Sequence, residues 1–153
     1  MSYQIRKAEL EDVNLLASIY ISAFAGEPWY ETWSYDKAKN RIYEVISSGN
    51  SLCFVCEDSK DIVGCSLCML MSWHTGMQLE GKEVFVNPKH QNKGIAEILI
   101  RHTESVAKTM DVTEFFFWTK RDGRSSNPDR LCNYYKRLGF TIAKERIIMV
   151  KAW

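Results

Sequence analysis

Residues 84–96 read Val84-Phe85-Val86-Asn87-Pro88-Lys89-His90-Gln91-Asn92-Lys93-Gly94-Ile95-Ala96, and this stretch decides the predicted fold. Its first residues are β-branched and aromatic, which is typical of a strand, and Pro88 ends that strand because proline cannot donate to a ladder. After Gly94 the apolar residues follow a helical period. The stretch therefore predicts a strand, a polar loop and a helix that begins at Gly94.

The start of this helix is a candidate anion site. The first N–H groups of a helix have no intrahelical partner, and the helix dipole adds partial positive charge, so a phosphate is favoured there. Gly94 has no Cβ that would keep a ligand away from the backbone, and Lys93 adds a cation beside it. An ordinary strand-to-helix turn is the alternative interpretation.

The segment Gln91–Ala96 resembles the Gln/Arg-x-x-Gly-x-Gly/Ala motif of the GNAT superfamily of acetyl-CoA-dependent N-acetyltransferases. Val86 and Pro88 are similar to the Val-x-Pro that often precedes this motif. The resemblance implies that the pyrophosphate of coenzyme A (CoA) lies on the amides of residues 91–96, and that exposed amides near Phe85 and Val86 polarise the thioester carbonyl. The cofactor-binding residues that it implies are Phe85, Val86, Gln91, Asn92, Lys93, Gly94, Ile95, Ala96 and Asn127.

A second motif, Tyr134-Tyr135-Lys136-Arg137-Leu138-Gly139-Phe140, resembles the aromatic-Tyr-x-x-Leu-Gly-Phe ending of the same family. In this ending a glycine closes a helix. The resemblance implies that Tyr135 protonates the departing thiolate of CoA, a step suited to a phenol with a pKa of about 10. Pro128 and Leu131 stand where the family often has asparagine and alanine, and Asn127 is one position early. A packed helix tyrosine is the alternative for Tyr135.

Glu83 is the candidate general base. It lies on a strand predicted over residues 82–86, and many GNAT enzymes take a base from a carboxylate on the corresponding strand, often acting through water. Glu80 is three residues earlier and should face the opposite side if the strand continues. A solvated strand-edge carboxylate is the alternative for both. His74, in a polar loop predicted over residues 74–81, could also be a base, but nothing near it in sequence pairs with it.

The segment 26–33 combines three large aromatic side chains with two carboxylates around a proline. Aromatic faces and carboxylates both attract cations, and the resemblance favours a substrate-facing role for part of this segment. The predicted substrate-binding residues are Glu27, Trp29, Tyr30 and Trp33. The alternative is that these rings simply pack between helices.

The remaining apolar periods complete an α/β fold. Strands are predicted over residues 3–8, 51–57, 62–73, 114–119 and 145–152, and helices over 9–24, 34–48, 95–110 and from Asn127–Pro128 onward. We expect one domain, residues 1–153, with the GNAT fold: a central mixed twisted sheet of about six to seven strands and helices on both faces.

Two Cys-x-x-Cys pairs, Cys53/Cys56 and Cys65/Cys68, superficially resemble halves of a zinc site. Both pairs lie on predicted strands, where residues three apart point to opposite faces, so one pair cannot easily hold one metal ion. We expect free thiols and no metal. Cys132 makes the cysteine count odd, which indicates a reducing compartment.

Composition excludes several classes of function. The net charge of +1 does not indicate a nucleic-acid binder, and no apolar run approaches the roughly 18 residues of a membrane span. The first residues lack the apolar core of a signal peptide, so we expect a cytoplasmic protein without membrane contact. Neither dinucleotide-binding nor nucleoside-triphosphate loop motifs occur.

The sequence is therefore interpreted as an N-acetyltransferase that moves the acetyl group of acetyl-CoA directly to a primary amine. Carboxylates among aromatic residues favour a small cationic acceptor, such as a polyamine or an aminoglycoside-like amine. A protein or peptide amine is an alternative acceptor, and a non-catalytic acyl-CoA-binding sensor is an alternative function. A zinc-dependent interaction module is a third reading. Many members of the superfamily are dimers, so the resemblance also allows a homodimer.

Overall fold

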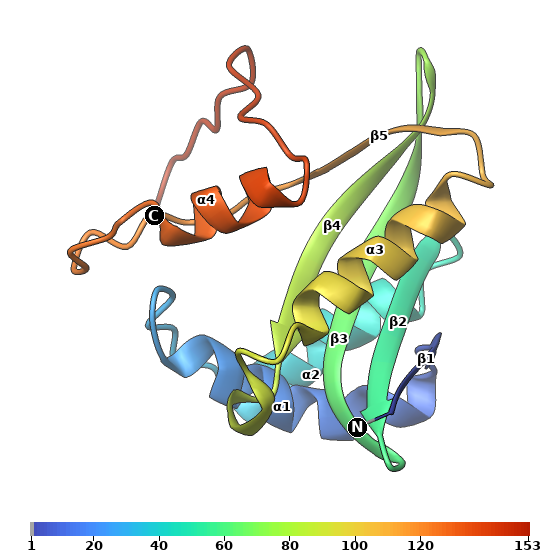
Figure 1. Cartoon of the computed structure of the whole chain (residues 1–153), viewed down its shortest axis with the longest axis vertical. Helices are drawn as coiled ribbons and strands as arrows, with labels where there is room; N and C mark the ends of the chain where they lie inside the picture. Colours follow the sequence, from blue (N-terminus) through green and yellow to red (C-terminus); the bar gives the residue numbers. More distant parts are fainter. Residues whose placement is uncertain (1) are drawn as a thin grey trace. The chain divides into compact units, whose positions relative to one another are not determined.

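The computed structural model describes residues 2–153. Contacts divide the chain into two compact units, Met1–Trp118 and Thr119–Trp153 (Figure 1). The elements of the first unit are β1 (Tyr3–Lys7), η1 (Leu10–Asp12), α1 (Val13–Ala25), α2 (Tyr35–Ile46), β2 (Ser51–Asp58), β3 (Asp61–Trp73), β4 (Gly76–Val86), η2 (Pro88–His90), α3 (Ile95–Ala107) and β5 (Val112–Phe117); the second unit contains α4 (Arg130–Arg137). The expected single domain stays a prediction.

The first unit is built on one mixed sheet with the strand order β1-β2-β3-β4-β5. Neighbouring strands are antiparallel except β4 and β5, which are parallel and joined through α3. This confirms the predicted mixed sheet and its strand–helix–strand crossover. The sheet has five strands in the described residues rather than the six to seven that the sequence predicted.

Helices cover both faces of the sheet, as predicted (Figure 1). Helices α1 and α2 pack on one face, where Leu16, Tyr20 and Ile42 are almost fully buried with Leu67 of β3. Helix α3 packs on the other face, where Leu99 is buried in a second apolar cluster. In β2 and β3 both faces are buried, which explains their nearly continuous apolar sequences.

Strand β4 begins at Gly76, so the polar loop predicted over residues 74–81 is wrong. Its polar residues pair within the sheet instead of facing water as a loop would. Gln78 donates from Nε2 to Glu114 Oε1 of β5 at 2.7 Å, and Leu79 beside it is fully buried. Only His74 and Thr75 remain as the turn between β3 and β4.

The second unit departs from prediction at both ends. Helix α4 begins after Asp129, not at Asn127–Pro128. It closes as predicted at Gly139, which has φ 98°, with Gly139 N donating to Lys136 O and Phe140 N to Tyr135 O, the pattern of a Schellman motif. The strand predicted over 145–152 is not found, since this segment has neither helix nor strand in the part of the chain that the structure describes.

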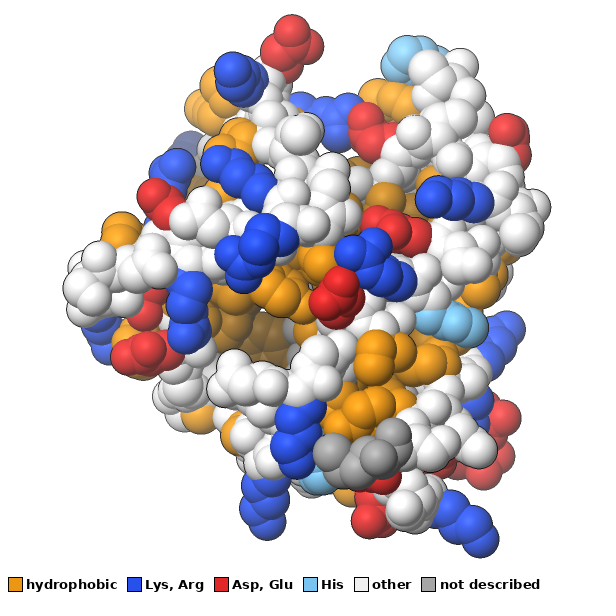
Figure 2. Space-filling view, viewed as in Figure 1, with side chains coloured by type: hydrophobic (Ala, Val, Ile, Leu, Met, Phe, Trp, Pro, Cys, Tyr) orange, Lys and Arg blue, Asp and Glu red, His pale blue; other side chains and the backbone are white. Residues whose placement is uncertain are grey.

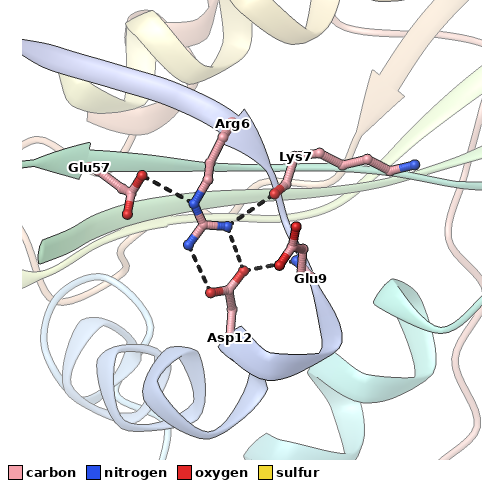
Figure 3. A network of polar contacts seen from close by, with 5 residues as sticks. All are labelled: Arg6, Lys7, Glu9, Asp12 and Glu57. Atoms are coloured by element: carbon pink, nitrogen blue, oxygen red, sulfur yellow. Dashed lines mark hydrogen bonds and ion pairs between the residues drawn. The ribbon is translucent and has the colours of Figure 1, made fainter. Parts of the chain in front are cut away.

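An ion-pair network ties the first strand to the first helix (Figure 3). Arg6 donates from Nη1 and Nη2 to the two carboxylate oxygens of Asp12 at 2.8 and 2.9 Å, and from Nε to Glu57 Oε1 at 3.1 Å. Its Nη1 also donates to Lys7 O, and the amide of Glu9 donates to Asp12 Oδ2 at 2.8 Å. Arg6 thus joins β1 to β2 through Glu57 and to the start of α1 through Asp12.

Replacing Asp12 with asparagine should lower the free energy of unfolding at pH 7 by about 2 kcal/mol, because hydrogen bonds to a charged group are lost. The bonds from Arg6 lower the pKa of Asp12 below its ordinary value, although burial opposes them. This contribution is present above the pKa of Asp12 in the unfolded chain and is lost as the pH falls through the folded pKa. Urea unfolding at several pH values measures it.

The control is Asp61→Asn, at the exposed first residue of β3. A difference between wild type and Asp12→Asn that stays constant down to strongly acidic pH would show that the negative charge of Asp12 is not what the network requires.

Candidate active site

The parallel strands β4 and β5 pair with each other over only a short stretch. β5 pairs with β4 only over Met77–Gly81 and ends opposite Gly81 at Phe117, whereas β4 continues to Val86 along β3. Residues 82–86 of β4 therefore border β3 on one side and have no β5 partner on the other. This is the backbone edge at which the sequence predicted exposed amides near Phe85 and Val86.

A β-bulge in β4 brings two carboxylates to one face of the sheet. Glu80 lies opposite Met69 and Glu83 lies opposite Leu67, so Lys82 is an extra residue in the pairing. Met69 and Leu67 are two apart on β3 and point to the same face, and Glu80 and Glu83 therefore do so as well. The expectation that these carboxylates face opposite sides is wrong, because it assumed regular alternation.

Two helix side chains hold Glu83 in place. Arg41 of α2 donates to Glu83 Oε1 from Nε at 3.1 Å and from Nη2 at 2.9 Å, and Tyr20 of α1 donates from its hydroxyl to the same oxygen at 3.2 Å. The Glu83 side chain is only 12% exposed. Burial raises the pKa of Glu83 above its ordinary value, and the bonds from Arg41 and Tyr20 oppose that rise.

Glu83 opens into a pocket of about 380 Å³ on the α1–α2 face of the sheet. The residues lining it are Tyr20, Phe24, Trp29, Glu31, Trp33, Arg41, Glu80, Gly81, Lys82, Glu83 and Trp118. Two of the predicted acceptor residues, Trp29 and Trp33, are among them. Glu27 and Tyr30, which were also predicted, are not, and Glu27 is exposed.

Glu31 was missed by the sequence prediction. A tight turn after α1 places it, in which the amide of Tyr30, at φ 52°, donates to Gly26 O and the amide of Glu31 donates to Phe24 O at 2.8 Å. Trp33 then donates from Nε1 to Glu31 Oε1 at 2.9 Å. The spacing Glu-x-Trp could have indicated this bond, but not that the pair faces a pocket.

Two of the three carboxylates that line the pocket form ion pairs, and the third forms none with the described residues. Glu83 is bound by Arg41, and Glu80 Oε2 is 2.8 Å from Lys82 Nζ. Glu31 forms no ion pair within residues 2–153, and its bond to the Trp33 indole brings no charge. With three carboxylates and two cations in the lining, the pocket carries one excess negative charge, which lies on Glu31.

The predicted anion loop lies between η2 and α3. Asn92 and Gly94 have positive φ angles of 62° and 78°, and no side chain caps α3 at Gly94. A Cβ on Gly94 would meet nothing within 4 Å, so the glycine is required by its left-handed backbone and leaves open space in front of the helix. Gln91 donates from Nε2 to Val86 O at 3.2 Å, which fastens the loop to the end of β4.

The loop can hold a pyrophosphate. Lys93, Gly94 and Asn92 are exposed, while Ile95 is buried and Ala96 half-buried, so the first turn of α3 is anchored and the loop before it is accessible. The uncapped N-terminus of α3, the adjacent lysine and the space before Gly94 fit a phosphate group.

Tyr135 and Asn127 lie in the second unit. Tyr135 is half-buried on α4, with its ring 5.3 Å from that of Tyr134 and 6.1 Å from that of Phe140. Asn127 is exposed before α4, and its amide donates to Ser125 Oγ at 3.0 Å. The roles predicted for both residues stay predictions.

Comparison with known proteins identifies the family. The sequence model described as "Acetyltransferase (GNAT) domain" matches residues 49–142, more than half of the chain. The chain belongs to the GNAT acetyltransferase family. This GNAT acetyltransferase is thus an N-acetyltransferase by family, although no curated protein matches its sequence significantly.

Solved structures share the fold of this GNAT acetyltransferase at low sequence identity. A possible acetyltransferase from Clostridium difficile 630 is 13% identical, with a TM-score of 0.83 and coverage of 100% of this chain and 99% of that chain. An aminoglycoside N-acetyltransferase in complex with CoA is 18% identical, with a TM-score of 0.70 and coverage of 99% and 95%. Glucosamine-6-phosphate N-acetyltransferase from Arabidopsis thaliana is 17% identical, with a TM-score of 0.67 and coverage of 100% and 99%.

Neither Cys-x-x-Cys pair of this GNAT acetyltransferase lines the pocket, and neither does His74. Cys53 belongs to the cluster under α1 and α2 and Cys56 to the cluster under α3, and Cys65 and Cys68 divide in the same way, so neither pair converges on one point. Burial raises the pKa of Cys53 and of Cys56 to about 11. His74 is exposed in its turn. Within residues 2–153, no helix is both long and apolar enough for a membrane span.

Proposed function

We propose that this GNAT acetyltransferase transfers the acetyl group of acetyl-CoA directly to the primary amine of a small cationic molecule, such as a polyamine or an aminoglycoside-like amine. The observation that carries the proposal is the acidic, aromatic pocket beside the open edge of β4. Carboxylates and aromatic faces both attract ammonium groups, and a pocket of about 380 Å³ suits a small molecule.

The residues proposed to hold CoA are those of the anion loop. The amides of residues 91–96, with Lys93 beside them, would bind the pyrophosphate, and the left-handed Gly94 and uncapped α3 support this role. The open β4 edge near Phe85 and Val86 would hold the carbonyl oxygen of the acetyl group through backbone amides. When bound, acetyl-CoA supplies the activated thioester.

In the proposed reaction, Glu83 takes a proton from the substrate ammonium, directly or through a water molecule. The amine nitrogen then forms a bond to the acetyl carbon while the carbon–sulfur bond breaks, and it loses its second proton to water, from which Tyr135 recovers the proton that it gives to sulfur. Tyr135 gives a proton to the departing sulfur, and no cysteine nucleophile takes part. Buried thiols with raised pKa values support this last point, because a thiol must ionise to attack.

Partner and compartment are proposed from charge and thiol chemistry. Figure 2 shows Lys and Arg side chains interspersed with Asp and Glu over the viewed face, which supports a small-molecule acceptor over a nucleic acid. All five cysteines are free, and this supports a reducing, cytoplasmic location. A homodimer stays a prediction.

The proposal is tested by calorimetry with acetyl-CoA together with a thiol-release assay over a panel of amines. Binding and release of CoA with a polyamine or an aminoglycoside would support it. Release only with peptide amines would replace the proposed acceptor, and binding without turnover on any amine would favour the acyl-CoA sensor. Absence of binding would contradict the role of the anion loop.

Replacing Gly94 with alanine should weaken acetyl-CoA binding about tenfold. A Cβ disfavours the left-handed backbone by about 1–2 kcal/mol, so the loop would relax and turn its amides away from the pyrophosphate. Calorimetric titration measures the change in Kd.

Gly49→Ala is the matched control, because Gly49 is exposed, has no positive φ and leaves open space for a Cβ. Equal affinities for CoA in wild type and Gly94→Ala would count against pyrophosphate binding at this loop.

A further inference from the structure

The pocket contains more negative charge than the proposed reaction uses. Its two cations are both engaged, Arg41 with Glu83 and Lys82 with Glu80, so each of these pairs is neutral as a whole. Glu31 alone adds an uncompensated charge. The reacting amine cannot balance it, because an amine must lose its proton before it attacks a thioester.

We infer that Glu31 binds a second ammonium group of the acceptor, one that stays protonated, so that the enzyme selects diamines and polyamines over monoamines. This inference rests on the proposed function and assigns its specificity to a residue. The second ammonium group of the substrate then neutralises the negative charge of Glu31, which the reacting amine cannot neutralise once it has lost its proton.

The surroundings of Glu31 suit an ammonium group. Its Oε1 accepts the indole N–H of Trp33, which fixes the carboxylate without neutralising it. Trp29 and Trp33 line the same pocket and add aromatic faces, which attract cations. The Trp33 ring is held edge-on by Tyr20 at 5.1 Å, and the Trp29 ring by Phe24 at 5.3 Å, so both are fixed before a ligand arrives.

Glu31 is also separate from the proposed base. It comes from the segment between α1 and α2, whereas Glu83 comes from β4, and the two carboxylates share one pocket without a common cation. A substrate with two amines can therefore place one nitrogen at Glu83 and the other at Glu31 within the same pocket. A monoamine can occupy only one.

The test compares α,ω-diamines of three to eight carbons with n-alkylamines of the same lengths, in the thiol-release assay with saturating acetyl-CoA. Wild type should show a kcat/KM for its preferred diamine at least about tenfold above that of the matched monoamine. Glu31→Gln should lower kcat/KM for the diamine about 10- to 100-fold, mainly through KM, because a charged partner is lost. It should change the monoamine values by less than about twofold.

Two further variants make the assignment specific. Glu44→Gln removes a carboxylate from the exposed side of α2 and should leave both substrate series unchanged. Glu27→Gln tests the carboxylate that the sequence favoured, and a loss of diamine preference there rather than in Glu31→Gln would overturn the inference.

The outcomes separate this inference from the function on which it rests. Equal kcat/KM for diamines and monoamines, or an equal loss of both in Glu31→Gln, would overturn the role of Glu31 and leave the acetyltransferase proposal intact. No thiol release with either series, or with any amine of the wider panel, would overturn the proposed function itself.

Discussion

Replacing Glu83 with glutamine is expected to lower kcat for amine acetylation by about 10²- to 10³-fold and to leave the Kd of acetyl-CoA unchanged. The hydrogen bonds from Arg41 and Tyr20 all end on Oε1 of Glu83. Oε2 is therefore the oxygen that can take the proton of the acceptor. Glutamine keeps an oxygen for Arg41 and Tyr20, but its amide cannot accept a proton.

The pH dependence should identify the base. Burial raises the pKa of Glu83, bonds from Arg41 and Tyr20 lower it, and the charge of Glu31 raises it, with a net shift above the ordinary value. A base must be deprotonated, so kcat/KM should fall as the pH drops through this raised pKa. The residual activity of Glu83→Gln should lack that fall.

A companion variant tests the same carboxylate without removing it. Arg41→Gln deletes the hydrogen bonds and charge that hold the pKa of Glu83 down, so the acidic limb of the pH profile should move to higher pH. If Arg41 had only a structural role, Arg41→Gln would lower stability but leave the acidic limb of the pH profile in place.

If Glu80→Gln abolishes turnover and Glu83→Gln does not, the base is Glu80, which the bulge places on the same face.

The anion loop and the crossover around it could be predicted because they depend on local chemistry. Pro88 ends a strand, Gly94 adopts a left-handed backbone, and the apolar period of α3 begins directly after it. Gly139 closes α4 for the same reason, since a positive φ at a helix end favours glycine. Each of these features depends on particular residues within a few positions of one another, so it can be predicted from the sequence alone.

The pocket could be predicted only in part, because it depends on pairings between distant segments. The extra residue Lys82 in β4 is visible only against β3, and it reverses the expected facing of Glu80. Glu31 lines the pocket because of a turn in which Tyr30 adopts a φ of 52°. A tyrosine in the sequence does not predict such a left-handed backbone. Similarly, the polar residues at the start of β4 indicate a loop until the bond of Gln78 to β5 is known.

Replacing Tyr135 with phenylalanine is expected to lower kcat by about 10²-fold, while KM for acetyl-CoA changes by less than about twofold. The substitution removes only the hydroxyl and keeps the ring that packs near Phe140. If the hydroxyl protonates the departing sulfur, its loss raises the barrier for breaking the carbon–sulfur bond but not the free energy of CoA binding. Steady-state kinetics and calorimetry on the same preparations separate the two quantities.

The matched control is the neighbouring Tyr134→Phe. Successive residues of a helix point about 100° apart, so at most one of these two hydroxyls can face a given sulfur atom. Tyr134 has its own contact, with the guanidinium of Arg137 5.7 Å from its ring, and this contact survives the change to phenylalanine. Because both variants lose one oxygen from the same helix, a defect confined to Tyr135→Phe must come from the position of the hydroxyl. Equal defects in the two variants, or a parallel loss of turnover and acetyl-CoA affinity in Tyr135→Phe, would instead mean that α4 needs its tyrosines for packing and that another group protonates the thiolate.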